Sequence, residues 1–229
     1  MEVGPGRGAL TGPLLDRGLR VLAFEIDPVL AVSLNKEFRE RTFFLVEEDA
    51  LEADVAAELE EIDAHAPVPL VANLPYESAT PMIRSFVRRP ELFSRLVVMV
   101  QKEVADRVVA PPGGDAYGFL TVDVNAHARA RRLFDVSPGS FRPPPQVHSS
   151  VIELVPHPSE PATGDALRIA SVGFLQRRKT LVNALTPLWG REKARLAVEQ
   201  AGLREDVRAE TLALPQFHAL VLLLGPPGR

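Results

Sequence analysis

The chain has 229 residues, 46% of them hydrophobic, so it can bury a sizeable core as one large domain or as one domain with an appendage. It has no cysteine, which excludes disulfides and a catalytic thiol, and no apolar run reaches the roughly 18 residues that a bilayer-spanning helix needs. A net charge of −4 argues against a protein that coats nucleic acid all over, and without a secretory leader we expect a cytoplasmic protein with no membrane partner.

The first part of the chain alternates short apolar runs with helical patterns. We expect strands at residues 20–25, 42–47, 68–72 and 96–101, and helices at 10–17, 28–38, 51–62 and 81–88. Such alternation predicts βαβ units and a mostly parallel, doubly wound sheet. The run at 68–72 is apolar throughout, which predicts a strand buried on both faces, although Pro69 leaves its beginning open.

The second part of the chain predicts a different organisation. A helix is expected at 102–109, followed by a mixed region with strands at 130–136 and 151–155 that would form a hairpin on the sheet edge. Residues 156–164 are rich in proline and turn formers and predict a linker. Beyond them the patterns are helical only, at about 165–176, 179–186, 191–201 and 215–224. We therefore expect an α/β domain over 1–156 and a small all-helical domain over 165–229.

Charge is distributed unevenly along the chain. Residues 1–100 carry 10 Lys and Arg against 17 Asp and Glu, whereas residues 156–229 carry 10 against 7. The mildly basic end permits a local face that binds a polyanion without requiring one. The five histidines show no metal-ligand spacing, so no metal is expected.

Polar side chains follow successive predicted strands. The chain opens with a glycine-rich turn that contains Gly4 and Gly6, and such turns let a ligand approach backbone N–H groups at a helix start. Glu25 ends the next strand, where an acidic residue would bind ribose hydroxyls, and Ile26 could pack on an adenine ring. Asp49, after the third strand, could accept from an adenine amino group. Glu25 and Asp49 could instead be solvated strand ends, or Asp49 a helix N-cap.

Asn73-Leu74-Pro75-Tyr76 follows the next predicted strand, at the sheet edge where open α/β sheets bind ligands. An amine on an aromatic ring is a poor nucleophile, and two acceptors on its hydrogens would counter that. The Asn73 side-chain oxygen and the backbone carbonyl of Leu74 or Pro75 are candidates for these two acceptors. Tyr76 would stack on the planar base that carries the amine. The alternative is an ordinary strand-to-helix turn.

Several further motifs accompany this one, and together they cover nearly the whole chain. They are Glu2-Val-Gly-Pro-Gly6, Phe24-Glu-Ile-Asp27, Asp49-Ala-Leu51, Val100-Gln-Lys-Glu-Val-Ala-Asp-Arg107, Tyr117-Gly118, Phe141-Arg-Pro-Pro-Pro-Gln-Val147 and Gly173-Phe-Leu-Gln-Arg-Arg-Lys-Thr-Leu181. With them the chain resembles the class I S-adenosylmethionine-dependent methyltransferases, which have a Rossmann-like sheet. Within these it closely resembles the ribosomal RNA adenine dimethyltransferases. The stretch at 176–185 points to the small-subunit, kasugamycin-sensitivity type.

The resemblance implies dimethylation of the exocyclic amine of two adjacent adenosines near the 3′ end of small-subunit ribosomal RNA. The substrate would be an immature small ribosomal subunit and the enzyme a monomer. S-adenosylmethionine would be converted to S-adenosylhomocysteine, without a metal. The resemblance assigns the cofactor to Gly4, Gly6, Glu25, Ile26, Asp49, Ala50 and Asn73. It assigns the target adenine to Asn73, Leu74, Pro75 and Tyr76, with Phe141 covering its other face.

The basic run Arg177-Arg178-Lys179 at a predicted helix start would bind phosphates, as would Arg142. Such contacts position RNA without reading its sequence. The alternative is a solvated basic face. With this run, the resemblance predicts that 165–229 is an RNA-binding domain.

The chain departs from the family pattern at its beginning, because the family usually has several tens of residues before the glycine turn. The departure predicts that the natural chain starts earlier or that this form is truncated, which would leave backbone groups unpaired on two neighbouring strands. Glu48 and His148 also stand where Gly and Asp are common.

Three other functions remain open from the sequence. An amine methyltransferase for DNA adenine or protein glutamine would tend to carry Asn-Pro-Pro-Tyr, so Leu74 and the basic run argue against it. A ribosome-assembly or RNA-binding factor that keeps the fold without turnover is a second alternative. A nicotinamide enzyme is disfavoured by the glycine spacing.

Overall fold

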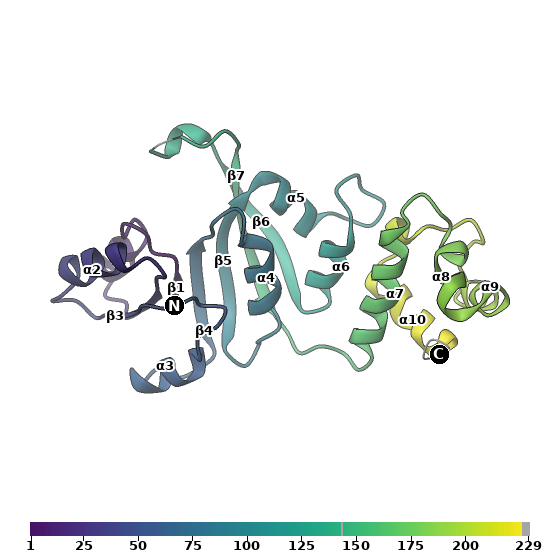
Figure 1. Ribbon diagram of the computed structural model, residues 1–229, viewed down its shortest axis with the longest axis horizontal. Coiled ribbons are helices and arrows are strands. Elements are labelled where there is room, and N and C mark those ends of the chain that lie inside the picture. Colours follow the sequence, from purple (N-terminus) through teal and green to yellow (C-terminus); the bar gives the residue numbers. More distant parts are fainter. Residues whose placement is uncertain (143, 226–229) are drawn as a thin grey trace. The chain divides into compact units, whose positions relative to one another are not determined.

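The computed structural model describes residues 1–142 and 144–225. The chain divides into two compact units (Figure 1). Unit 1 comprises Met1–Ala105 and Ala128–His157, and unit 2 comprises Asp106–His127 and Pro158–Arg229. The helical unit thus includes residues 106–127 in addition to the C-terminal segment expected from the sequence.

Unit 1 is built on a seven-stranded sheet in the order β3-β2-β1-β4-β5-β7-β6 (Figure 1). The parallel strands are β1 (Glu2–Val3), β2 (Val21–Phe24), β3 (Phe43–Val46), β4 (Val68–Asn73) and β5 (Phe93–Gln101). The antiparallel strands β6 (Ala128–Val136) and β7 (Ser149–Pro156) form the edge hairpin. The predicted doubly wound, mostly parallel sheet is therefore confirmed.

Helices α1 (Thr11–Asp16), α2 (Pro28–Glu37), α3 (Val55–Glu61) and α4 (Ala79–Phe86) connect the parallel strands, and α5 (Lys102–Val109) follows β5. Asp27 caps α2 by accepting from the N–H groups of Val29 and Leu30, and Pro28 supplies the fixed φ favoured at a helix start. Helix α3 begins later than the predicted residue 51, because Asp54 accepts from Ala57 N–H and fixes its start.

Strand β4 is buried on one face only, so the prediction of burial on both faces was wrong. Leu70 and Ala72 are buried, whereas Val71 is half-buried and Pro69 is exposed. Pro69 and Val71, on the other face of the strand, line an apolar cavity of about 280 Å³. Protein atoms therefore do not fully cover that face. The strand register also shifts between Val68 and Pro69, an irregularity at which a proline is tolerated.

The two-residue strand β1 pairs with both of its neighbours. Glu2 and Val3 lie opposite Ala23 and Phe24 of β2, and opposite Val71 and Ala72 of β4. The Met1 ammonium also donates to the Pro69 carbonyl at 2.9 Å. The strand therefore places the residue that follows it, Gly4, between the ends of β2 and β4.

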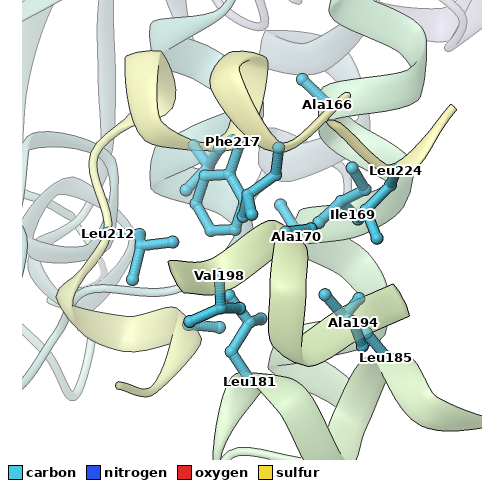
Figure 2. Packing of buried hydrophobic residues seen from close by; sticks show 14 of the residues in the cluster. Ala166, Ile169, Ala170, Leu181, Leu185, Ala194, Val198, Leu212, Phe217 and Leu224 are labelled. Carbon is cyan, nitrogen blue, oxygen red and sulfur yellow. The ribbon is translucent and has the colours of Figure 1, made fainter. Parts of the chain in front are cut away.

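Unit 2 is helical, with α6 (Phe119–Asn125), α7 (Thr163–Leu175), α8 (Leu181–Trp189), α9 (Arg191–Gln200) and α10 (Leu214–Leu224). Its apolar core joins side chains from these helices (Figure 2), among them Ile169, Leu181, Leu185, Val198, Phe217 and Leu224. The sequence did not predict α6. Tyr117, just before it, belongs to the same core and donates its hydroxyl to the Leu212 carbonyl at 2.5 Å. Burial raises the pKa of Tyr117 to about 12.

None of the helices in the described part of the chain has both the length and the apolar character required to span a membrane.

Candidate active site

The backbone of the glycine turn after β1 borders unfilled space at Gly4 and Gly6. Gly4 and Gly6 have φ angles of +62° and +60°, which side chains rarely adopt, and a Cβ at either position would meet no atom within 4 Å. The Gly4 N–H donates to the Phe24 carbonyl at 3.0 Å, so the turn is fixed against the end of β2. Both glycines predicted to contact the cofactor thus border space that a ligand can enter.

Glu25 follows β2 and is buried, with 7% of its surface exposed, so it is not a solvated strand end. Its Oε2 accepts from Gly6 N–H at 3.0 Å and its Oε1 accepts from Asp27 N–H at 3.1 Å. A carboxylate offers about four acceptor positions, so these two bonds orient it and leave others for ribose hydroxyls. Glu25 therefore links the glycine turn to the end of β2.

Ile26, Asp49 and Ala50 lie beyond the ends of β2 and β3. Ile26 is 68% exposed, so its side chain offers an apolar surface that a planar ring could cover. The Asp49 Oδ1 accepts from Leu51 N–H at 2.9 Å, which fixes the turn, and Ala50 is buried. Asp49 is not the N-cap of α3, because Asp54 has that position.

The turn Asn73-Leu74-Pro75-Tyr76 begins at the last residue of β4. Leu74 is buried and its N–H donates to the Met99 carbonyl at 3.1 Å, so the turn is attached to β5. Asn73 and Pro75 are exposed. The Pro75 carbonyl accepts from Ser78 N–H at 3.2 Å. A buried leucine thus anchors a turn in which the neighbouring Asn73 is exposed.

Phe141 lies far from this turn in the sequence but borders the same pocket. The pocket has a volume of about 250 Å³ and is lined by Asn73, Leu74, Pro75, Tyr76, Phe141 and Pro145. Pro143, one of three consecutive prolines that the sequence predicts to stiffen the chain after Phe141, lies outside the described residues. Arg142 is exposed beside Phe141.

The sequence analysis assigned no role to Glu2 or Ser149, two buried polar residues near the strand ends that form the candidate site. The Glu2 side chain is buried and accepts from the Thr11 hydroxyl at 2.8 Å, and burial raises its pKa. Ser149, the first residue of β7, is fully buried, and its hydroxyl lies 3.0 Å from the Tyr76 hydroxyl. The one sequence signal for Ser149 was a pair of serines just before a predicted strand.

The basic run lies in the turn between α7 and α8 rather than at a helix start, since Thr180 caps α8. All three residues of the run are exposed, and Arg177 also donates to the Tyr117 carbonyl at 3.3 Å and pairs with Glu210 at 3.4 Å. A hollow of about 700 Å³ is lined by residues 174–179. Part of this run is therefore structural.

Within residues 1–142 and 144–225, no cluster of three or more Asp, Glu or His side chains is arranged to hold a metal ion.

Comparison with known proteins gives a family and a fold. The family model described as ribosomal RNA adenine dimethylase matches residues 1–225. Ribosomal RNA small subunit methyltransferase A of Thermosynechococcus vestitus is 40% identical over 96% of this chain and 83% of the relative. The protein of the same name from Streptococcus pneumoniae is 39% identical over 96% of this chain and 80% of the relative.

Two solved structures share the fold. A dimethyladenosine transferase from Plasmodium falciparum superposes with a TM-score of 0.76 at 23% identity, covering 99% of this chain and 90% of that one. The 23S rRNA methyltransferase ErmE superposes with a TM-score of 0.72 at 23% identity, covering 97% of this chain and 89% of that one. The family match over residues 1–225 and the 40% identical relative show that this chain belongs to the ribosomal RNA adenine dimethylase family.

Proposed function

We propose that this chain dimethylates the exocyclic amines of two adjacent adenosines near the 3′ end of small-subunit ribosomal RNA, with S-adenosylmethionine as the methyl donor. The observation that carries the proposal is the pocket shared by the Asn73–Tyr76 turn and Phe141. The strand registers place Asn73 beside the glycine turn, because Ala72 lies opposite Val3. A base in this pocket would therefore lie close to a cofactor above β1.

The residues at the strand ends fit the parts of that cofactor. The open turn at Gly4 and Gly6 has room for the methionine portion, and the oriented Glu25 carboxylate can accept from ribose hydroxyls. Asp49 would accept from the adenine amine beside Ala50, while the exposed Ile26 would pack against the ring.

The target adenine would lie between Tyr76 and Phe141. Stacking of a base on an aromatic side chain contributes about 1–3 kcal/mol. The Asn73 side-chain oxygen would accept one hydrogen of the target amine. The Leu74 carbonyl is the better second acceptor, because the Pro75 carbonyl already accepts from Ser78.

The bound cofactor supplies a methyl group on a positively charged sulfur. In the first transfer, two acceptors on the amine hydrogens would hold the nitrogen lone pair toward that methyl group and stabilise the positive charge that develops on nitrogen. In the second transfer the amine has one hydrogen left, so one acceptor would hold it. As the new N–C bond forms, the bond from the methyl group to sulfur would break and its electron pair would stay on sulfur, leaving S-adenosylhomocysteine. The proton that the methylated nitrogen loses would pass to water. Catalysis would rest on positioning and electrostatics, with no covalent enzyme intermediate.

The target base must leave the RNA stack or lie in an unpaired loop to enter the pocket. Arg142 beside the pocket, and Arg178 and Lys179 in unit 2, are exposed cations that would bind RNA phosphates. Arg177 would contribute less, because Tyr117 and Glu210 already hold it. Residues 165–229 would thus supply RNA contacts while 1–156 carries out methyl transfer, in a cytoplasmic monomer that acts on immature small subunits.

The test is transfer of tritiated methyl groups from S-adenosylmethionine to immature small ribosomal subunits. We expect Asn73→Ala to lower the rate about 100- to 1,000-fold, the loss typical of removing a positioned polar group at a reacting centre. Asn35→Ala is the matched control, because Asn35 is also an exposed asparagine of unit 1 but lies on α2. The control should retain the wild-type rate.

The same assay separates the alternatives when it is also run with DNA and protein as acceptors and is paired with a measurement of RNA binding. Incorporation that survives Asn73→Ala would contradict the proposed role of the turn. RNA binding without incorporation by the wild-type chain would indicate an assembly factor. Incorporation into DNA or protein, but not into subunits, would indicate a different amine methyltransferase.

A further inference from the structure

The Tyr76 ring is held at both ends. Its backbone belongs to the turn that Leu74 attaches to β5, and its hydroxyl lies 3.0 Å from the hydroxyl of Ser149, 73 residues further along the chain. A ring with two rotatable side-chain bonds is fixed when its far end is bonded to a rigid partner. The strength and angle of stacking on a target base then depend on that partner.

Ser149 is a rigid partner because it lies within the sheet. Its backbone is in register with Gln101 of β5 on one side and with Val136 of β6 on the other. The preceding carbonyl, of His148, accepts from Lys102 N–H at 2.9 Å, which fixes the entry into β7. The Ser149 side chain is fully buried, where a hydroxyl is costly unless it is hydrogen-bonded.

We infer that Ser149 is a positioning residue for methyl transfer, acting through the Tyr76 hydroxyl to orient the ring that stacks on the target adenine. This inference rests on the proposed function of the Asn73–Tyr76 turn. Ser149 does not line the pocket itself, whose lining includes Tyr76 and Phe141. Small displacements of groups around a reacting centre have large effects on rate, so loss of the hydroxyl should be measurable.

Ser150 provides a matched control. It is the next residue of β7, is equally buried, and its hydroxyl donates to Asp135 at 2.6 Å rather than to Tyr76. A general defect in β7 would appear in both Ser149→Ala and Ser150→Ala. A defect in Tyr76 orientation should appear in Ser149→Ala alone.

The first measurement needs no substrate. The chain has two tyrosines, Tyr76 and Tyr117, so tyrosine labelled with ¹³C at Cζ gives two resonances. We expect Ser149→Ala to shift the Tyr76 resonance and to leave that of Tyr117, which is bonded to Leu212 in unit 2. Ser150→Ala should leave both in place. A Tyr76 resonance that does not move in Ser149→Ala would overturn the inference.

The second measurement is a double-mutant cycle on methyl transfer. Ser149→Ala and Tyr76→Phe should each lower kcat about 3- to 10-fold, as expected for one hydrogen bond, with an unchanged KM for S-adenosylmethionine. The double variant should be no slower than either single variant, because both remove the same bond. Effects that multiply, or an unchanged kcat in Ser149→Ala, would contradict the positioning role.

Two outcomes remain distinguishable. If Ser149→Ala does not fold, Tyr76→Phe removes the other hydroxyl of the same hydrogen bond. An unchanged kcat in Tyr76→Phe would then refute the inference. If the wild-type chain transfers no methyl group to small subunits, the proposed function fails. The tyrosine resonances would still test the contact in that case.

Discussion

Phe141 in unit 1 and Phe217 in unit 2 show that the same type of side chain has different surroundings in the two units. Phe217 on α10 is fully buried in the apolar core of unit 2 (Figure 2). Its ring centroid lies 6.5 Å from that of Phe174. Phe141 is half-buried and borders the pocket beside Asn73. The first ring is surrounded by the protein itself, whereas the second leaves a surface for a ligand. Loss of Phe217 should therefore affect stability, and loss of Phe141 activity.

The glycines repeat the contrast. At Gly6 an added Cβ would point into open space, whereas at Gly173 in α7 it would lie 2.6 Å from the Ala209 Cβ. Gly6 keeps a backbone accessible to a ligand, and Gly173 lets two parts of unit 2 pack closely. Four variants would test whether this division between a ligand-facing edge and a packed helical core holds.

The largest effect is expected for Phe217→Ala. Removing a fully buried phenylalanine should lower the free energy of unfolding of unit 2 by about 3–5 kcal/mol. Urea unfolding followed by the fluorescence of Trp189 measures it, because this is the chain's one tryptophan, it lies on α8, and its indole N–H donates to the Gly225 carbonyl. Affinity for S-adenosylhomocysteine below the transition should stay at the wild-type value. A weakened cofactor affinity would break the proposed division.

Phe141→Ala should show the opposite pattern. Loss of one stacking surface, about 1–3 kcal/mol, should lower methyl transfer about 5- to 150-fold. The unfolding midpoint should stay unchanged, because the ring is only half-buried. A destabilised protein with a normal rate at low temperature would show that Phe141 is a packing residue.

Gly173→Ala should have an intermediate effect on stability. Overpacking against Ala209 costs about 1–3 kcal/mol, and the better helix propensity of alanine returns up to about 1 kcal/mol. Trp189 fluorescence should therefore report a destabilised unit 2. Adding Ala209→Gly removes the clashing methyl group and should restore much of the loss. Failure of this second change to help would mean that the contact is not the cause.

The smallest effect is expected for Glu153→Gln in unit 1. Glu153 on β7 pairs with Arg131 and, at 3.1 Å, with Arg95, and the hydrogen bond from Arg131 holds the pKa of Glu153 below its ordinary value. A lowered carboxyl pKa contributes stability above the ordinary glutamate pKa, and this contribution is lost as pH falls through the lowered value. The variant should melt slightly below wild type near neutral pH. The two should converge once the pH falls below the lowered pKa of Glu153, and a constant difference across pH would exclude the ion pairs as its source.

Much of the site could be predicted because its determinants are local. Glycines with positive φ, an acidic residue after β2 and the Asn73-Leu74-Pro75-Tyr76 turn lie next to apolar runs, and parallel strands bring their carboxyl ends to one edge. The same local patterns predicted the alternation of strands and helices along the first part of the chain. Their roles toward cofactor and base stay predictions.

The division of the chain between the two units illustrates what local sequence patterns leave undetermined. Tyr117 and α6 lie between α5 and β6 in the sequence, yet both belong to unit 2, where the Tyr117 hydroxyl donates to the Leu212 carbonyl. The partly exposed face of β4 is a similar case, because an apolar run predicts burial whether or not atoms cover both sides.

The sequence by itself determined the family, the alternation of strands and helices, and the residues at the strand ends. Only the tertiary structure decided that Ser149 meets Tyr76, that Arg177 is engaged by Tyr117 and Glu210, and that Phe141 borders the pocket of Asn73. Backbone preferences and apolar periodicity act over a few residues, so they can be read along the chain. Contacts between distant side chains depend on strand register and packing, which exist only once the chain has folded.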